Sequence, residues 1–334
     1  MRITREKLLK FAQNFVEQQI FFKKRAVCIY LTGSLLSDEP LLGGTTDVDL
    51  IYVHDSEPPV EREIVRVTDE VHLDIAHVSQ ARFTHPRQLR ADPWLGVFLC
   101  YNPKMLYDTQ HWFEFTQAAV AAQFYLPNYI IDRARPLAES ARQAWFGLHS
   151  GQASSPEKTL SYLKALEWSA NSIALLSGPP LTERRFLLNY PARAAAVERP
   201  GLASGLVDLL VGDQNLPQEE LTAIMDGWRQ ALAEAARNEN CPPRLQAPRL
   251  QYYTRSAEAL LPGSQAAALW LIMRTWTSAA FFLGTESASF KNWQTTCHSL
   301  GLDSQGIDER LDTLDAYLDS IEETLDIWSQ KNGT

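Results

Sequence analysis

Two short apolar segments, separated by a turn-rich loop, constrain the fold of this chain most strongly. Residues 27–31 (VCIYL) and 50–53 (LIYV) are rich in β-branched and aromatic side chains and are bounded by turn residues, so we expect two buried strands. The first segment leads into Gly33-Ser34, and the second comes directly after Asp47-Val48-Asp49. Alternate residues of a strand share a face, which predicts that the two aspartates project side by side.

The aspartate pair indicates a cation site beside a phosphate-binding turn. Two carboxylates this close repel each other unless a cation or a proton lies between them. Hard oxygen ligands of this kind suit Mg²⁺, which takes one or two carboxylates together with phosphate oxygens. Gly33 would let a phosphate approach the backbone, and Ser34 would offer its hydroxyl at the start of a short helix, expected at about 34–38. The simpler interpretation of Ser34 is an ordinary helix cap.

A third carboxylate lies further along the chain. Residues 63–68 and 71–78 read as antiparallel strands joined by a tight turn at 69–70. The apolar residues of the second strand alternate, which places Asp74 on the face away from the core. Taken alone, Asp74 reads as a solvent-facing carboxylate on an edge strand, because exposed Asp is common.

The whole pattern resembles the nucleotidyltransferase superfamily of the DNA polymerase beta type. In that family a strand leads into Gly-Ser, about a dozen residues follow, and Asp-x-Asp opens the next strand; here the similarity covers roughly residues 26–110. It implies that Asp47, Asp49 and Asp74 are catalytic and hold two Mg²⁺ or Mn²⁺ ions, and that Gly33 and Ser34 bind an NTP such as ATP. It also implies an α+β fold, in which a small mixed β-sheet with flanking helices precedes a mainly α-helical domain.

The second half of the chain is expected to be helical almost throughout. A polar loop at 150–155 suggests a boundary between a catalytic domain, residues 1–150, and a helical domain, residues 151–334. A proline-rich linker near 238–250 would divide the latter into two helical layers. In this half we expect helices at 157–176, 182–195, 200–211, 217–237, 254–284 and 305–329.

Residues 177–185 (SGPPLTERR) are similar in layout to the second domain of the antibiotic nucleotidyltransferases, of the aminoglycoside and kanamycin type. That resemblance implies that Arg184 or Arg185 reaches the triphosphate, a role that suits the planar fork of Arg. The alternative is that both are solvated surface charges.

The C-terminal segment carries a heptad pattern. Apolar residues alternate at spacings of four and three between Ile307 and Trp328, with acidic residues on the other faces. One interpretation is a helix docked on its own bundle, which favours a monomer. The other is a seam with a second copy or a partner, which would make a homodimer through residues 307–328.

Charge and composition narrow the class of partner. The net charge is −9, and the last 34 residues carry nine acidic and two basic side chains. No basic stripe of the kind that nucleic-acid binders use is present, which argues against a nucleic-acid substrate. The four cysteines lack paired spacing, the N-terminus lacks an apolar signal region, and the apolar stretch 261–283 contains Arg274. We therefore expect a cytoplasmic enzyme that does not span a membrane.

The function implied by the resemblance is transfer of a nucleoside monophosphate from an NTP to a hydroxyl of a small-molecule or protein acceptor. Pyrophosphate would be released by a two-metal mechanism. The alternative is a nucleotide-binding or degenerate relative that acts as a sensor or an antitoxin-like interaction protein, with the heptad segment as its interaction device.

Overall fold

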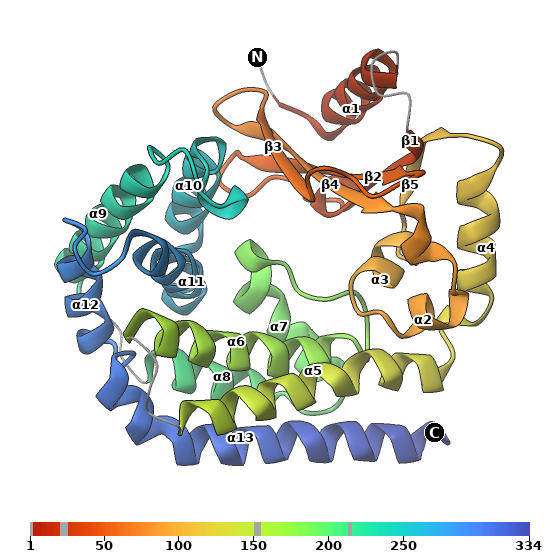
Figure 1. Ribbon diagram of the computed structural model, residues 1–334. Coiled ribbons are helices and arrows are strands. Elements are labelled where there is room, and N and C mark those ends of the chain that lie inside the picture. Colours follow the sequence, from red (N-terminus) through yellow and green to blue (C-terminus); the bar gives the residue numbers. More distant parts are fainter. Residues whose placement is uncertain (1–2, 21–25, 150–154, 213–215) are drawn as a thin grey trace. The chain divides into compact units, whose positions relative to one another are not determined.

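The computed structural model describes residues 3–20, 26–149, 155–212 and 216–334 of the chain (Figure 1). The fold is α+β with a helical majority, and it divides into two compact units, Met1–Tyr129 (unit 1) and Ile130–Thr334 (unit 2). The boundary predicted at 150/151 lies outside the described residues. The division between the two units falls in the first turn of helix α5 (Pro127–Leu148), and the rest of α5 belongs to the same unit as the helices that follow it.

Unit 1 is built on a five-stranded mixed sheet with the strand order β3-β4-β2-β1-β5. β2 and β4 run parallel to each other, and the other three pairs are antiparallel. The strands are β1 (Ala26–Thr32), β2 (Thr46–His54), β3 (Arg62–Arg66), β4 (Val71–Ser79) and β5 (Lys104–Asp108). The predicted strands are therefore present, and β2 begins early enough to include both aspartates of the pair.

One face of the sheet is covered by helix α1 (Arg5–Ile20), which lies along it in Figure 1. Leu8, Ala12 and Val16 of α1 are buried against alternate residues of the central strands. These strand residues are all apolar: Ile29, Leu31, Val48, Leu50, Tyr52, Leu73 and Ile75. Burial of a side chain of this size contributes about 1.5–3 kcal/mol, so the register of β2 and β4 is fixed by this core. The residues between them, including the aspartates, must then point to the other face.

The opposite face of the sheet is covered by helices near the edge formed by β1 and β5. They are η2 (Gln80–Phe83), α2 (Pro86–Ala91), α3 (Leu95–Cys100) and α4 (Trp112–Phe124). The ring of Phe113 in α4 lies 5.2 Å from that of Tyr30 in β1, and Phe83 meets Trp112 edge to face at the same distance. This second small core holds α4 against the sheet.

Unit 2 is helical in all of its described regular elements. The α-helices after α5 are α6 (Ser155–Ala174), α7 (Phe186–Ala196), α8 (Gly201–Val211), α9 (Gln218–Ala235), α10 (Leu250–Leu260), α11 (Gln265–Leu283), α12 (Phe290–Ser299) and α13 (Ser304–Lys331). Short 3₁₀ turns precede α7 and α10: η3 (Glu183–Arg185), η4 (Pro243–Leu245) and η5 (Ala247–Arg249). The single helix predicted at 254–284 is wrong, because the chain turns at Pro262-Gly263 and Ser264 then caps α11 by accepting a hydrogen bond from Ala267 N.

Helix α11 is long and apolar enough to cross a membrane, but 72% of its most apolar 18-residue stretch is buried inside the protein. Trp270 stacks on Phe186 at 4.2 Å, Thr275 accepts a hydrogen bond from Trp228, and Arg274 pairs with Glu167 at 2.8 Å. These contacts are typical of the core helix of a soluble protein, as the sequence predicts.

Helix α13 docks on the other helices of unit 2. Its apolar seam is buried from Ile307 to Leu325. Arg142 of α5 lies between three acidic residues of α13, at Asp315, Asp319 and Glu322, and Trp145 donates a hydrogen bond to the Leu311 carbonyl. The heptad seam is therefore an internal packing surface, as the first of the two interpretations predicts.

Candidate metal centre

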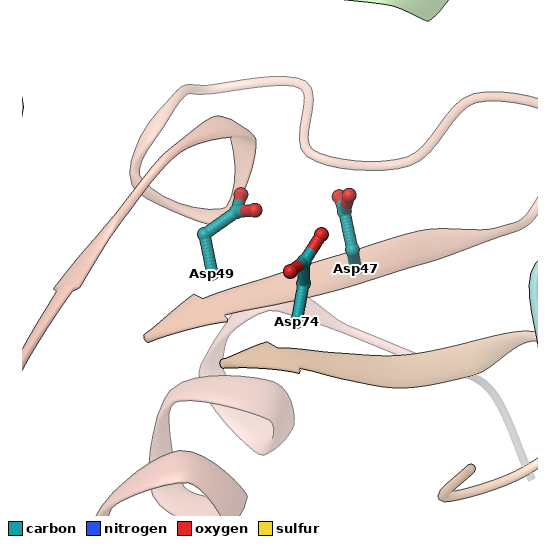
Figure 2. A group of neighbouring side chains, drawn as sticks. All are labelled: Asp47, Asp49 and Asp74. Atoms are coloured by element: carbon teal, nitrogen blue, oxygen red, sulfur yellow. The ribbon is translucent and has the colours of Figure 1, made fainter. Parts of the chain in front are cut away.

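The structure brings the carboxylates of Asp47, Asp49 and Asp74 together. Asp47 and Asp49 lie two residues apart on β2, and Asp74 lies on β4 directly beside Asp49 in the parallel register. Figure 2 shows all three side chains on the same side of these strands. Each residue offers an oxygen atom such that the three atoms lie within 4.8 Å of one another. The same-face prediction for the three aspartates is thus confirmed, and we call this group the acidic triad.

The donor set of the triad fits a hard divalent cation. Asp47 and Asp74 are buried and Asp49 is half-buried. Charges roughly 5 Å apart at an effective dielectric constant of about 20 repel by about 3 kcal/mol, so three ionised carboxylates need compensation. Oxygens around an octahedral Mg²⁺ or Mn²⁺ lie roughly 3–4 Å apart, a spacing that small side-chain movements of the triad would reach.

The loop before β2 contains a tight hydrogen-bonded turn that leads to the triad. Leu42 and Thr45 exchange two backbone hydrogen bonds of 3.1 Å across Gly43-Gly44. Both glycines have positive φ, 60° and 73°, as the tight hairpin turn of type I′ requires. Thr46 then donates its hydroxyl to the Pro40 carbonyl. This segment fixes where β2 starts and therefore where Asp47 emerges.

Gly33 lies against the triad. Its φ is 79°, and a Cβ atom built on it would lie 1.8 Å from Oδ2 of Asp49. A side chain at this position would therefore displace the Asp49 carboxylate. The sequence predicts that Gly33 lets a phosphate approach the backbone. In the structure, the group that approaches Gly33 closely is the protein's own Asp49 carboxylate.

Ser34 follows with its hydroxyl buried. Ser34 Oγ has no hydrogen-bond partner among the described residues. The helix predicted at 34–38 is the single 3₁₀ turn η1 (Ser34–Leu36), whose last carbonyls, of Leu35 and Leu36, accept hydrogen bonds from Arg5. A single turn has little dipole to attract a phosphate. The feature of Ser34 that would favour a phosphate is therefore its unsatisfied hydroxyl.

Sequence reasoning missed Arg62, which forms an ion pair with the triad. Its Nε donates to Asp74 Oδ1 and its Nη2 to Asp74 Oδ2, both at 2.6 Å. The strand had been expected to begin at residue 63, one residue too late. Alternation along β3 was the available signal: Ile64 lies opposite Asp74 in the antiparallel register, so Arg62 shares that face.

Arg184 and Arg185 lie on η3 in unit 2. Arg184 is buried, its guanidinium carbon lies 3.5 Å from the centre of the Tyr252 ring, and Nη1 donates to Ser256 Oγ at 2.9 Å. The surface-charge alternative is therefore wrong for Arg184. Arg185 is half-buried. A contact of either residue with a triphosphate stays a prediction.

The neighbouring Glu183 is surrounded by basic groups. Burial alone would raise the pKa of Glu183, but the guanidinium groups of Arg244, Arg274 and Arg249 outweigh it and hold the pKa below its usual value. Tyr253 donates its hydroxyl to Glu183 at 3.2 Å; burial and the Glu183 charge raise the pKa of Tyr253 to about 12. Glu183 is therefore the anionic centre of an arginine-rich cluster that joins η3, η4, η5 and α10.

No protein-family model matches the chain, and no curated protein is significantly similar to it in sequence. The fold and the site define an α+β protein whose mixed sheet carries three converging carboxylates that could hold a metal ion.

Proposed function

We propose that the protein is a nucleotidyltransferase that moves a nucleoside monophosphate from an NTP to an acceptor hydroxyl and releases pyrophosphate. The observation that carries the proposal is the convergence of Asp47, Asp49 and Asp74 within 4.8 Å, next to Gly33-Ser34. Carboxylate triads on adjacent strands suit two-metal phosphoryl chemistry, and the buried hydroxyl of Ser34, the residue after Gly33, would suit a phosphate oxygen.

The residues would divide the work as follows. Asp47 and Asp49 would bind both cations, and Asp74 would complete the coordination of one and orient the acceptor hydroxyl. Ser34 would donate its hydroxyl to a phosphate oxygen. The bound Mg²⁺ or Mn²⁺ would lower the pKa of the acceptor hydroxyl and neutralise charge on pyrophosphate. Positioning and electrostatics would supply most of the rate enhancement.

The acceptor is proposed to be a small molecule or a protein side chain. The chain is acidic overall, at −9, which fits a cationic or neutral acceptor better than a nucleic-acid end. A cytoplasmic location is proposed because the four cysteines lack the paired spacing of a disulfide framework. The alternative, a sensor or antitoxin-like interaction protein, drew on the heptad segment, and α13 buries that seam inside unit 2.

A transfer assay tests this proposal. The full chain is incubated with each α-labelled NTP, Mg²⁺, and pools of small molecules and proteins, and the label is followed into products. Asp49→Asn should lower transfer at least 100-fold, since even groups that only support a metal ligand are worth about 10–100-fold. Melting should show Asp49→Asn folded and at least as stable without Mg²⁺, because one repulsive charge is gone.

The matched control is Asp69→Asn, which removes an exposed carboxylate paired with Arg66 at the turn between β3 and β4. It should transfer label as the wild type does. A wild-type protein that transfers no label, and whose melting temperature does not respond to Mg-NTP, would contradict the proposal.

A further inference from the structure

We infer that Arg62 is a built-in counter-ion that competes with the divalent cation for Asp74, so that it sets how tightly the metal centre loads. The inference rests on the proposed function, because it concerns the same triad. Arg62 is not itself proposed to touch substrate.

The geometry of the pair is two-pronged. Both carboxylate oxygens of Asp74 accept a hydrogen bond from Arg62, each at 2.6 Å. A fork-to-fork pair of this kind is the strongest arrangement that an arginine and a carboxylate adopt. A cation bound to either oxygen would have to share it with the guanidinium or displace that group.

The charges also oppose each other. With Arg62 in place, the triad and Arg62 together carry two negative charges instead of three, and the positive group lies against a ligand oxygen. A divalent cation that binds Asp74 therefore meets a like charge beside its ligand oxygens, and this repulsion opposes binding. Metal affinity is lowered in either case: by this repulsion if Arg62 stays in place, and by the loss of the two hydrogen bonds of the ion pair if it moves away.

Arg62 is placed where it can leave. β3 is an edge strand, Arg62 is its first residue, and its side chain is 51% exposed while that of Asp74 is 2% exposed. Water can solvate the guanidinium once it is released, whereas the buried carboxylate needs a positive partner at all times. The pair thus holds the Asp74 carboxylate oriented until a cation replaces Arg62.

The competing role and a supporting role predict opposite results. If Arg62 competes, its removal tightens metal binding. If Arg62 instead holds Asp74 in the shape that the metal requires, its removal weakens binding. Arg66 is the matched control, since it lies on the same strand and face and pairs with exposed Asp69 at 2.6 Å. Arg66→Gln removes the same charge without touching the triad.

The experiment measures Mn²⁺ binding to the full chain without nucleotide. Binding is followed by calorimetry and by the loss of the electron paramagnetic resonance signal of free Mn²⁺. Arg62→Gln should bind Mn²⁺ about 10-fold or more tightly than the wild type, the effect expected for one charged hydrogen-bonding partner. Arg62→Lys, which keeps the charge but loses the fork, should fall between the two. Arg66→Gln should match the wild type, and Asp74→Asn should bind more weakly.

Melting provides a second readout that does not depend on activity. Without Mn²⁺, Arg62→Gln should melt below the wild type, because Asp74 is left buried without its cation partner. Saturating Mn²⁺ should raise its melting temperature more than that of the wild type. If the wild type binds Mn²⁺ and Arg62→Gln binds it equally well or more weakly, the inference about Arg62 is overturned but the proposed metal centre is not. Absence of Mn²⁺ binding in both proteins would overturn the proposed metal centre and the inference with it.

Discussion

At the scale of single residues, Gly33 shows how tightly backbone and site are coupled. Its backbone, at φ 79° and ψ −162°, lies in a region that residues with a Cβ avoid, and the Asp49 carboxylate fills the space where that Cβ would be. Gly44 offers a matched comparison, since its φ is 73° but nothing lies within 4 Å of its Cβ position.

Gly33→Ala should therefore damage the site more than Gly44→Ala does. Both changes should lower the free energy of unfolding by about 1 kcal/mol or more, because both place a side chain at positive φ. Only Gly33→Ala should also weaken Mn²⁺ binding, since its methyl group must push Asp49 aside. Urea unfolding and Mn²⁺ titration measure the two effects separately. Equal Mn²⁺ affinity in the two variants would show that Gly33 does not shape the metal centre.

The residue-scale predictions that held depend on local rules. The period of two in a strand was enough to place Asp47, Asp49 and Asp74 on one face, because the alternating apolar residues fix which face is core. Arg62 needed more than local rules. Its pairing with Asp74 follows from the register between β3 and β4 and from where β3 begins, and strand ends are poorly defined by sequence pattern.

At the scale of elements, the misses have physical causes. Residues 254–284 read as one helix because both halves are apolar and periodic, yet the Pro262-Gly263 step and the Ser264 cap make two helices. Helix α12 was not predicted, because its short, polar sequence shows little periodicity and it is held by tertiary contacts such as the hydrogen bond from Trp293 to Thr277.

The arginine-rich cluster around Glu183 predicts a pH effect on the packing of η3 against α10. The pKa of Glu183 is lower in the folded protein than in the unfolded chain, so the unfolded state binds more protons at acid pH. Its stabilising contribution is thus fully present above the unfolded pKa, near 4.5, and is lost as the pH falls through the folded pKa.

Glu183→Gln should accordingly cost about 1–3 kcal/mol at pH 7, because it removes the carboxylate that faces Arg244, Arg249 and Arg274. The difference from the wild type should shrink as the pH falls below about 4.5. Urea unfolding at several pH values measures it. Glu258→Gln, which breaks an exposed pair with Arg229, should change stability by less than about 1 kcal/mol at every pH. A constant gap between Glu183→Gln and the wild type would refute the account of the cluster.

At the scale of the whole molecule, the acidity of the chain has a structural explanation. Most acidic residues of α13 form ion pairs inside unit 2 with cations from other parts of that unit, among them Arg142, Arg135 and Lys158. The charge excess of the C-terminal segment therefore fixes a helix on its own bundle. The apolar seam of α13, from Ile307 to Leu325, is buried within the same unit.

The central claim, that the acidic triad is a divalent cation site, is tested most directly by anomalous X-ray diffraction. Crystals of the full chain would be grown with Mn²⁺ and a non-hydrolysable NTP analogue. The account predicts an anomalous peak roughly 2.1 Å from carboxylate oxygens of β2 and β4, with phosphate oxygens completing the coordination. Bound analogue with no anomalous peak at Asp47, Asp49 and Asp74 would contradict it.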